Sequence, residues 1–142
     1  MSREIHRWRL LRHGYVNLMA GLLMGIPIGA GWHARAWLGV HVIQITSSLA
    51  VVVLGLVWRD LQLPDPKLLR LYRLTLGAIY LGLAVGVFNG SVNFPGPVSQ
   101  PGVVPPAWHA VVAVPTGLAV IVMLFWSVAL TIRGLGESKV ES

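Results

Sequence analysis

The hydrophobic positions of this chain gather into four long stretches, and the segments outside them hold every charged residue and most of the prolines. A helix rises about 1.5 Å per residue, so each stretch is long enough to cross roughly 30 Å of membrane hydrocarbon. The stretches are Gly14–Gly31, Ala36–Trp58, Leu74–Val92 and Ala107–Ile132. They predict an all-α integral membrane protein in which residues 1–142 form a single domain, a four-helix bundle.

Composition agrees with this class of protein. The chain of 142 residues is 55% hydrophobic and 11% charged, and its mean hydropathy is +0.70. These values describe a membrane protein rather than a soluble domain. The chain contains no cysteine, which excludes disulfides, thiolate catalysis and cysteine-ligated iron–sulfur clusters.

The basic residues predict the orientation of the bundle. Ten of the eleven Lys and Arg lie on the side of the two termini, so the positive-inside rule predicts cytoplasmic termini and the inner (plasma) membrane of a bacterium. The formal net charge of +6 does not indicate nucleic-acid binding, because these residues flank the spans, where anionic lipid headgroups lie. The ten are Arg3, Arg7, Arg9, Arg12, Arg59, Lys67, Arg70, Arg73, Arg133 and Lys139, and Arg35 lies on the other side.

Glycines and prolines mark two further features. Glycine recurs every four residues in the first span and again in the third, at Gly21, Gly25, Gly29, Gly82, Gly86 and Gly90. Such spacing favours close packing of membrane helices, although glycine is also common in membrane helices in general. The second outer connection, residues 93–106, holds five of the nine prolines and no charge. It is either a stiff cap over the bundle or an ordinary connection.

Polar residues at membrane depth are the candidates for function, because they are costly there unless they have partners or a task. His41, Gln44 and Ser48 form a stripe at helical spacing in the second span, and His41 lies in its outer half. Asn89, Asn93 and His109 lie at the same depth, and we expect them to share an outer pocket with His41. At the other end of the bundle, His13 and Asn17 are one turn apart and are expected to form a structural hydrogen-bonded pair.

The available side chains restrict the chemistry. All five acidic residues lie outside the spans, which argues against a proton-coupled carrier and against carboxylate-based hydrolysis. Too few ligands remain for a catalytic zinc site, which usually takes three. Haem brings four ligands of its own and needs only one axial histidine. From the residues alone, His41 is either such a ligand or a buried histidine whose nitrogens bond to neighbours.

Several sequence fragments resemble a known family. They are Arg12-His13-Gly14, Gly21-Leu22-Leu23-Met24-Gly25, His41 early in the second span, Gly55-Leu56-Val57-Trp58 with Leu61 and Leu63, and Arg133-Gly134-Leu135. Their order and spacing resemble those of the hydroxylaminobenzene mutases. Ala34-Arg35-Ala36 ahead of His41 and the His-Gly pair of the first span also resemble the styrene oxide isomerases, which share the four-helix architecture.

The resemblance implies a homotrimer that holds haem b between subunits, with His41 as the axial ligand of the iron. Some positions depart from the family pattern. The asparagine that follows the histidine by six residues is Ser47 here, and the isomerases' aspartate and catalytic tyrosine fall at Ala78 and near Gly86. Of the mutases' Tyr-x-Asn motif only Tyr80 remains.

The expected function is therefore a membrane enzyme, a haem-dependent isomerase or mutase that rearranges a small aromatic epoxide or N-hydroxylamine, with the iron as a Lewis acid and no net redox change. Tyr80, Ser47 and Asn89 are the candidates for orienting the substrate. Two alternatives remain open. One is a b-type cytochrome or membrane anchor in which His41 and His109 both ligate haem, and the other is a cofactor-free transporter or assembly subunit.

Overall fold

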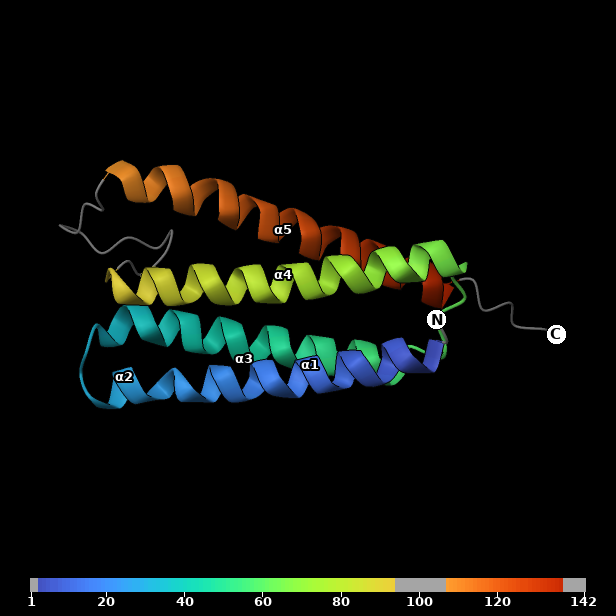
Figure 1. Ribbon diagram of the computed structural model, residues 1–142, viewed down its shortest axis with the longest axis horizontal. Helices are drawn as coiled ribbons and strands as arrows, with labels where there is room; N and C mark the ends of the chain where they lie inside the picture. Colours follow the sequence, from blue (N-terminus) through green and yellow to red (C-terminus); the bar gives the residue numbers. More distant parts are fainter. Residues whose placement is uncertain (1–2, 94–106, 137–142) are drawn as a thin grey trace.

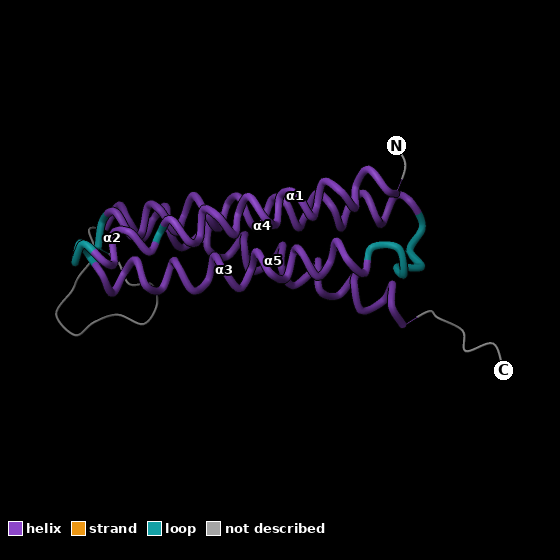
Figure 2. The backbone as a smooth tube through the Cα atoms, turned by 90° about the horizontal axis from the view of Figure 1, so that it is seen from below, coloured by secondary structure: helices purple, strands orange, loops and turns teal. Residues whose placement is uncertain are grey.

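The computed structural model describes residues 3–93 and 107–136, and this part of the chain is helical, without strands. The long helices lie side by side along one axis, and each runs antiparallel to the next (Figure 1, Figure 2). The helices are α1 (Arg3–Leu23), α2 (Gly25–Gly29), α3 (Ala34–Val57), α4 (Asp65–Ser91) and α5 (Ala107–Gly136). The prediction of an all-α architecture is confirmed. The proline-rich residues 94–106, where a cap was expected, lie outside the described residues.

Three of the described helices, α3, α4 and α5, are long and apolar enough to cross a membrane. α3 and α5 begin within two residues of the predicted spans. α4 begins at Asp65, well before the predicted Leu74, because Pro66 lies in its first turn, where proline favours helix initiation. The basic residues ahead of the third span are therefore helical.

The first predicted span, Gly14–Gly31, differs most from the structure. α1 begins at Arg3 and ends at Leu23, and the short α2 continues in the same direction. The interruption has a local cause in Pro27, which has no N–H to donate to the carbonyl of Leu23 and whose ring crowds the preceding turn.

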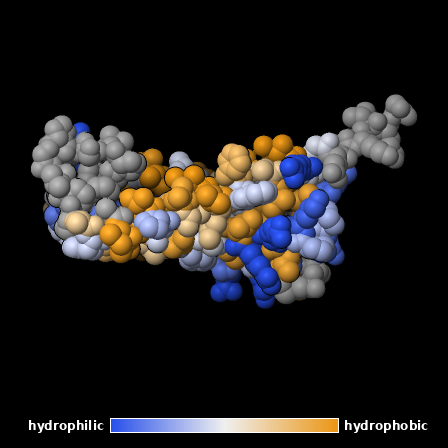
Figure 3. Space-filling view, turned by 90° about the horizontal axis from the view of Figure 1, so that it is seen from above, coloured by the Kyte–Doolittle hydropathy of each residue, from blue (hydrophilic) through white to orange (hydrophobic). Residues whose placement is uncertain are grey.

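The N-terminal end of α1, the α3–α4 connection and the C-terminal end of α5 all lie at one end of the molecule (Figure 1). Hydrophilic residues gather toward this end, and apolar residues cover the middle of the molecule (Figure 3). We call it the arginine end. The described basic residues other than Arg35 thus share one side, as predicted, while their cytoplasmic location stays a prediction.

A hydrophobic core closes the arginine end. Trp58, Leu61 and Leu63 are almost fully buried although they lie in or next to a connection between helices. The backbone N–H of Gln62 donates to the carbonyl of Gly134 at 2.9 Å, which joins this connection to α5. The core thus brings Trp58, Leu61 and Leu63 together with Leu130 of α5.

Glycines set the spacing between α3 and its neighbours. A Cβ atom added at Gly21 of α1 would lie 3.1 Å from Ile45, and one at Gly86 of α4 would lie 2.7 Å from Val40. At Gly90 it would lie 2.7 Å from the ring of Trp37. Close packing is therefore confirmed at these positions. It does not extend to Gly29, where an added Cβ meets nothing within 4 Å.

Candidate functional site

His41 faces α1 across the tight α1–α3 interface. Its Nδ1 lies 2.8 Å from the backbone oxygen of Gly21. Because a carbonyl oxygen only accepts hydrogen bonds, Nδ1 carries the proton, and Nε2 keeps its lone pair. The ring is half-buried, and Nε2 has no hydrogen-bond partner among the described residues. A histidine held through Nδ1 by a backbone carbonyl, with Nε2 open, has the arrangement of a metal-ligating imidazole.

One helical turn toward the arginine end, a second hydrogen bond joins the same two helices. The side-chain amide of Gln44 donates to Oδ1 of Asn17 at 2.7 Å, and both residues are buried, with 3% and 0% exposure. Asn17 in turn donates to the backbone oxygen of His13 at 3.1 Å. We call Gly21–His41 and Asn17–Gln44 the two α1–α3 hydrogen bonds. They account for two of the three residues of the polar stripe, and the third, Ser48, donates to the carbonyl of Gln44.

Tyr80 pairs with His13 rather than with another residue of the third span. Its hydroxyl lies 2.6 Å from His13 Nδ1, and the two rings meet edge to face at 89°. The tyrosine is 39% exposed, so this contact lies at the surface of the helices. The expected His13–Asn17 pair therefore forms through the backbone of His13, which leaves its ring for Tyr80.

His109 and Asn89 form a separate contact between α5 and α4. Nε2 of His109 lies 2.9 Å from Oδ1 of Asn89, and the imidazole stacks on Phe88 with ring centroids 5.3 Å apart. His109 is 1% exposed. Of the four residues expected to share an outer pocket, the structure joins these two. His41 bonds to α1 instead, and Asn93 is exposed with a positive φ of 57°.

Ser47 lies in a third environment. Its hydroxyl donates to the carbonyls of Ile43 and Gln44 on its own helix. It also lines an apolar groove of about 270 Å³ between α3, α4 and α5. Other hydroxyl groups along this groove belong to Thr75, Ser127 and Thr131. Tyr80, Ser47 and Asn89 thus have different partners, and within the described chain none of the three bonds to another.

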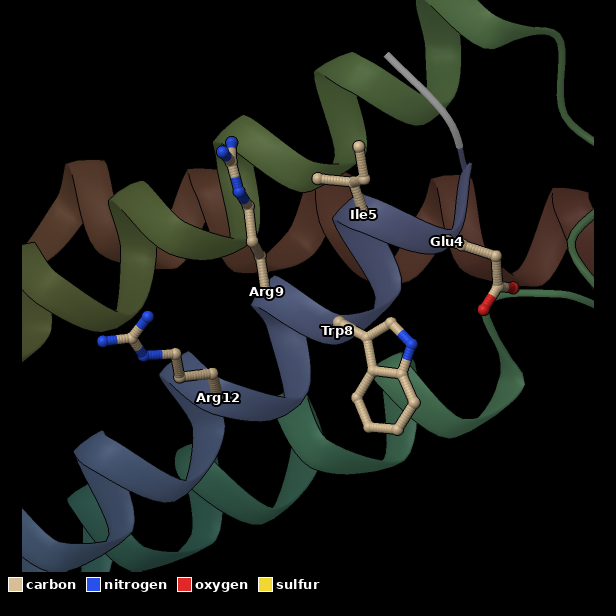
Figure 4. Close-up of a pocket in the computed structure, with 5 residues that line it drawn as sticks. All are labelled: Glu4, Ile5, Trp8, Arg9 and Arg12. Atoms are coloured by element: carbon tan, nitrogen blue, oxygen red, sulfur yellow. The ribbon is translucent and has the colours of Figure 1, made fainter.

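A further surface pocket of about 310 Å³ lies on α1 at the arginine end. All of its lining side chains project from this one helix, and Trp8 is 62% exposed (Figure 4). The lining residues are Glu4, Ile5, Trp8, Arg9 and Arg12. Asn17 and Gly21 lie on the buried side of the same helix, so this pocket is separate from the two α1–α3 hydrogen bonds.

Sequence reasoning missed two of these contacts. The partner of His41 is a backbone oxygen, which a pattern of side chains does not predict. The one available signal is Gly21 itself, because its lack of a side chain allows α3 to approach. The His13–Tyr80 contact joins positions 67 residues apart in the chain. No signal in the sequence points to it, because His13 directly precedes the first predicted span whereas Tyr80 is the seventh residue of the third.

These observations define the class of protein, an all-helical membrane protein with one histidine held in a ligand-like geometry at a helix interface. The family follows from a comparison with protein-family models, in which the styrene oxide isomerase model matches residues 6–136. The chain therefore belongs to the styrene oxide isomerase family. No curated protein and no solved structure matches the chain.

Proposed function

We propose that this protein is a membrane isomerase that converts a small aromatic epoxide into the corresponding aldehyde. Membership of the styrene oxide isomerase family supports an isomerase that acts on epoxides. In this reaction one epoxide C–O bond breaks and a hydrogen moves between the two neighbouring carbons. No water, electron or external proton is consumed.

The geometry of His41 carries the cofactor part of the proposal. Its Nδ1–H is occupied by the Gly21 carbonyl at 2.8 Å, and its Nε2 is left as a basic nitrogen without a partner in the described chain. These residues fit haem b, whose iron His41 would hold through Nε2. When bound, the haem iron supplies an electron-pair acceptor for the substrate oxygen.

The protein then has to orient the ring of the substrate and exclude water, which would otherwise add to the opened epoxide. Tyr80, Ser47 and Asn89 are our candidates for orienting it. The positions where the family carries its aspartate and tyrosine serve packing here, because Ala78 is 1% exposed and a Cβ at Gly86 would lie 2.7 Å from Val40. Orienting groups must therefore come from elsewhere in the chain.

The open Nε2 also bears on assembly. It lies at the surface of the helices rather than inside an enclosed cavity of the described chain. A haem bound there would extend beyond the described chain, where lipid tails or another copy of the chain would cover it. This is compatible with the homotrimer that the family resemblance implies, in which the cofactor lies between subunits.

Ligation by both His41 and His109 is less well supported. The Nε2 atom of His109 is engaged by Asn89, and the ring is stacked on Phe88 and buried between α4 and α5. His41 faces α1. The contacts of the two histidines therefore support His41 alone as the residue that would hold the iron.

The test is His41→Ala, with His109→Ala as the matched control. Loss of the axial ligand should remove haem and reduce turnover of an aromatic epoxide to background, while alanine preserves the helix. His109→Ala should keep the haem absorption band. Both variants are purified in detergent and compared by absorption spectrum and by aldehyde formation. An aromatic N-hydroxylamine is assayed beside the epoxide, because Tyr80 retains part of the mutase motif.

Three outcomes contradict parts of the proposal. A colourless wild-type protein excludes the haem and favours the transporter or assembly subunit. A six-coordinate low-spin spectrum that changes in both variants indicates two histidine ligands. A His41→Ala protein with the wild-type spectrum and turnover overturns the assignment of the ligand and the mechanism together.

A further inference from the structure

The two α1–α3 hydrogen bonds are consecutive contacts along one interface. Asn17 and Gly21 lie four residues apart on α1, and their partners Gln44 and His41 lie three residues apart on the antiparallel α3. Each separation is about one turn of helix. The alignment that brings Asn17 to Gln44 therefore also brings the Gly21 carbonyl to His41.

The Asn17–Gln44 hydrogen bond favours this one alignment of α1 and α3 because it is buried. A buried amide that loses its partner destabilises the folded protein, and more so where no water reaches it. A slip of α1 along α3 carries Oδ1 of Asn17 away from the amide of Gln44 and leaves both buried groups without this partner. A single buried polar contact is known to select one register between packed helices.

The Gly21–His41 hydrogen bond does not select a register by itself in this way. The imidazole is half-buried, and its acceptor is a backbone oxygen that belongs to the α1 hydrogen-bond ladder as well. Gly25 lies beside the ring, and an added Cβ there would lie 3.6 Å from Cε1, so this glycine leaves room for about a methyl group on that side of the ring. Something else must hold the ring at this carbonyl.

We propose that Asn17 and Gln44 are positioning residues for His41. Their buried hydrogen bond fixes the register in which the Gly21 carbonyl accepts from Nδ1, and thereby keeps the proton on Nδ1 and the lone pair on Nε2. The consequence for haem rests on the proposed function. The effect on the imidazole does not, because it belongs to the haem-free protein.

The decisive variant is the double replacement Asn17→Leu with Gln44→Met. It removes both polar groups, keeps similar side-chain volumes and leaves no unpaired amide, so the helices should still pack. In the haem-free protein, ¹⁵N NMR of the His41 ring reports which nitrogen carries the proton. We expect the ratio of the Nδ1–H form to the Nε2–H form to fall at least about fivefold, as the loss of one hydrogen bond predicts.

Two controls separate positioning from general stability. Leu71→Ala removes a fully buried side chain on α4 and should lower thermal stability without changing the His41 ring signals. The exchange Asn17→Gln with Gln44→Asn keeps the total length of the pair and should restore the wild-type signals. If the double variant does not fold, Gln44→Met alone is measured in the same way.

Haem titration then connects the register to the cofactor. A loss of the orienting partner of a metal-ligating histidine lowers affinity about 10–100-fold, and we expect this range for the double variant. Unchanged His41 ring signals in a folded variant overturn the positioning role, whatever the wild-type protein binds. Altered ring signals in a protein whose wild type takes up no haem uphold the register and overturn the proposed function instead.

Discussion

The α1–α3 interface and helix α5 represent two extremes of packing within one small protein. A third of the membrane-length part of α3 is buried inside the chain, compared with 6% for α5. The α1–α3 interface holds glycines, two interhelical hydrogen bonds and the candidate ligand. α5 packs mainly along α4, and its C-terminal end also meets the α3–α4 connection (Figure 1). The candidate ligand therefore lies in the region with the closer packing, whereas α5 is tied to α4 by the His109–Asn89 contact near one end.

The exposed face of α5 is apolar along its length. Phe125 is 74% exposed, Val111 73% and Ile121 64%. In water such an apolar face would promote aggregation, but in a membrane lipid tails or a second copy of the chain can cover it. α5 therefore meets lipid or another chain along most of its surface, whereas α3 has part of its surface buried within the described chain.

The largest expected difference between the two regions concerns glycine. A Cβ at Gly14 of α1 would lie 2.7 Å from the side chain of Val52 and 3.1 Å from its backbone nitrogen, and backbone does not move aside easily. Gly14→Leu should therefore destabilise the protein by about 3 kcal/mol or more through overpacking. Gly117→Leu on α5 should cost almost nothing, because an added Cβ there meets no atom within 4 Å.

Thermal unfolding of both leucine variants in the same detergent makes the measurement. Equal melting temperatures would remove the contrast between the interfaces. A large loss in Gly117→Leu alone would show that another chain covers this part of α5, and size-exclusion chromatography of that variant then reports whether the oligomer dissociates.

The same contrast explains what the sequence could predict. The apolar stretches predicted the helices, and the positions of the arginines predicted that the basic residues share one end. Both features follow from the local composition of the sequence. The break after Leu23 depends on Pro27. The proline can be read in the sequence, but a hydropathy pattern alone does not show that it interrupts the helix. The depth of α5 in the bundle was not predictable, because an apolar helix looks the same whether lipid or protein surrounds it.

The candidate site was predictable in its residues and not in its contacts. His41 and Gln44 stood out because polar groups are costly in apolar segments. Their partners, the Gly21 carbonyl and Asn17, depend on how α1 aligns with α3, which side-chain spacing on one helix does not determine. For the same reason His109 was grouped by depth with both His41 and Asn89, and the structure joins it to Asn89 but not to His41.

A smaller effect is expected at the outer end of α5. His109 holds this end to α4 through Asn89 and Phe88. His109→Ala should cost about 1–2 kcal/mol, since it removes one hydrogen bond and one ring contact. Hydrogen exchange should rise in the first turns of α5 and stay unchanged in α3. Uniformly faster exchange in both helices would show that α5 supports the α1–α3 interface after all.

The smallest effect belongs to the ion pair that ties α1 to the residues after α3. Arg59 donates to both carboxylate oxygens of Glu4, at 2.7 and 2.9 Å, and these hydrogen bonds hold the pKa of Glu4 below its usual range, with a further contribution from Arg7. Because the folded-state pKa lies below the unfolded one, the pair adds stability at neutral pH. This contribution fades as the pH falls through about 4 and is gone below the folded-state pKa.

Glu4→Gln should remove this part of the acid dependence and change stability little at neutral pH, because both side chains are exposed and such pairs are weak. Melting temperatures at pH 7 and near pH 3.5 measure it, at low ionic strength where screening is smallest. Arg59→Gln is the matched variant. It should flatten the same pH range, and the double variant should add nothing further, since the two residues act through one contact. Two results would contradict this prediction: effects of the two single variants on the melting temperature that add up fully in the double variant, or an unchanged acid dependence in Glu4→Gln. Either would show that the ionic contact at the arginine end does not stabilise the α1–α3 interface. The interface would then depend on its buried hydrogen bonds and glycines alone.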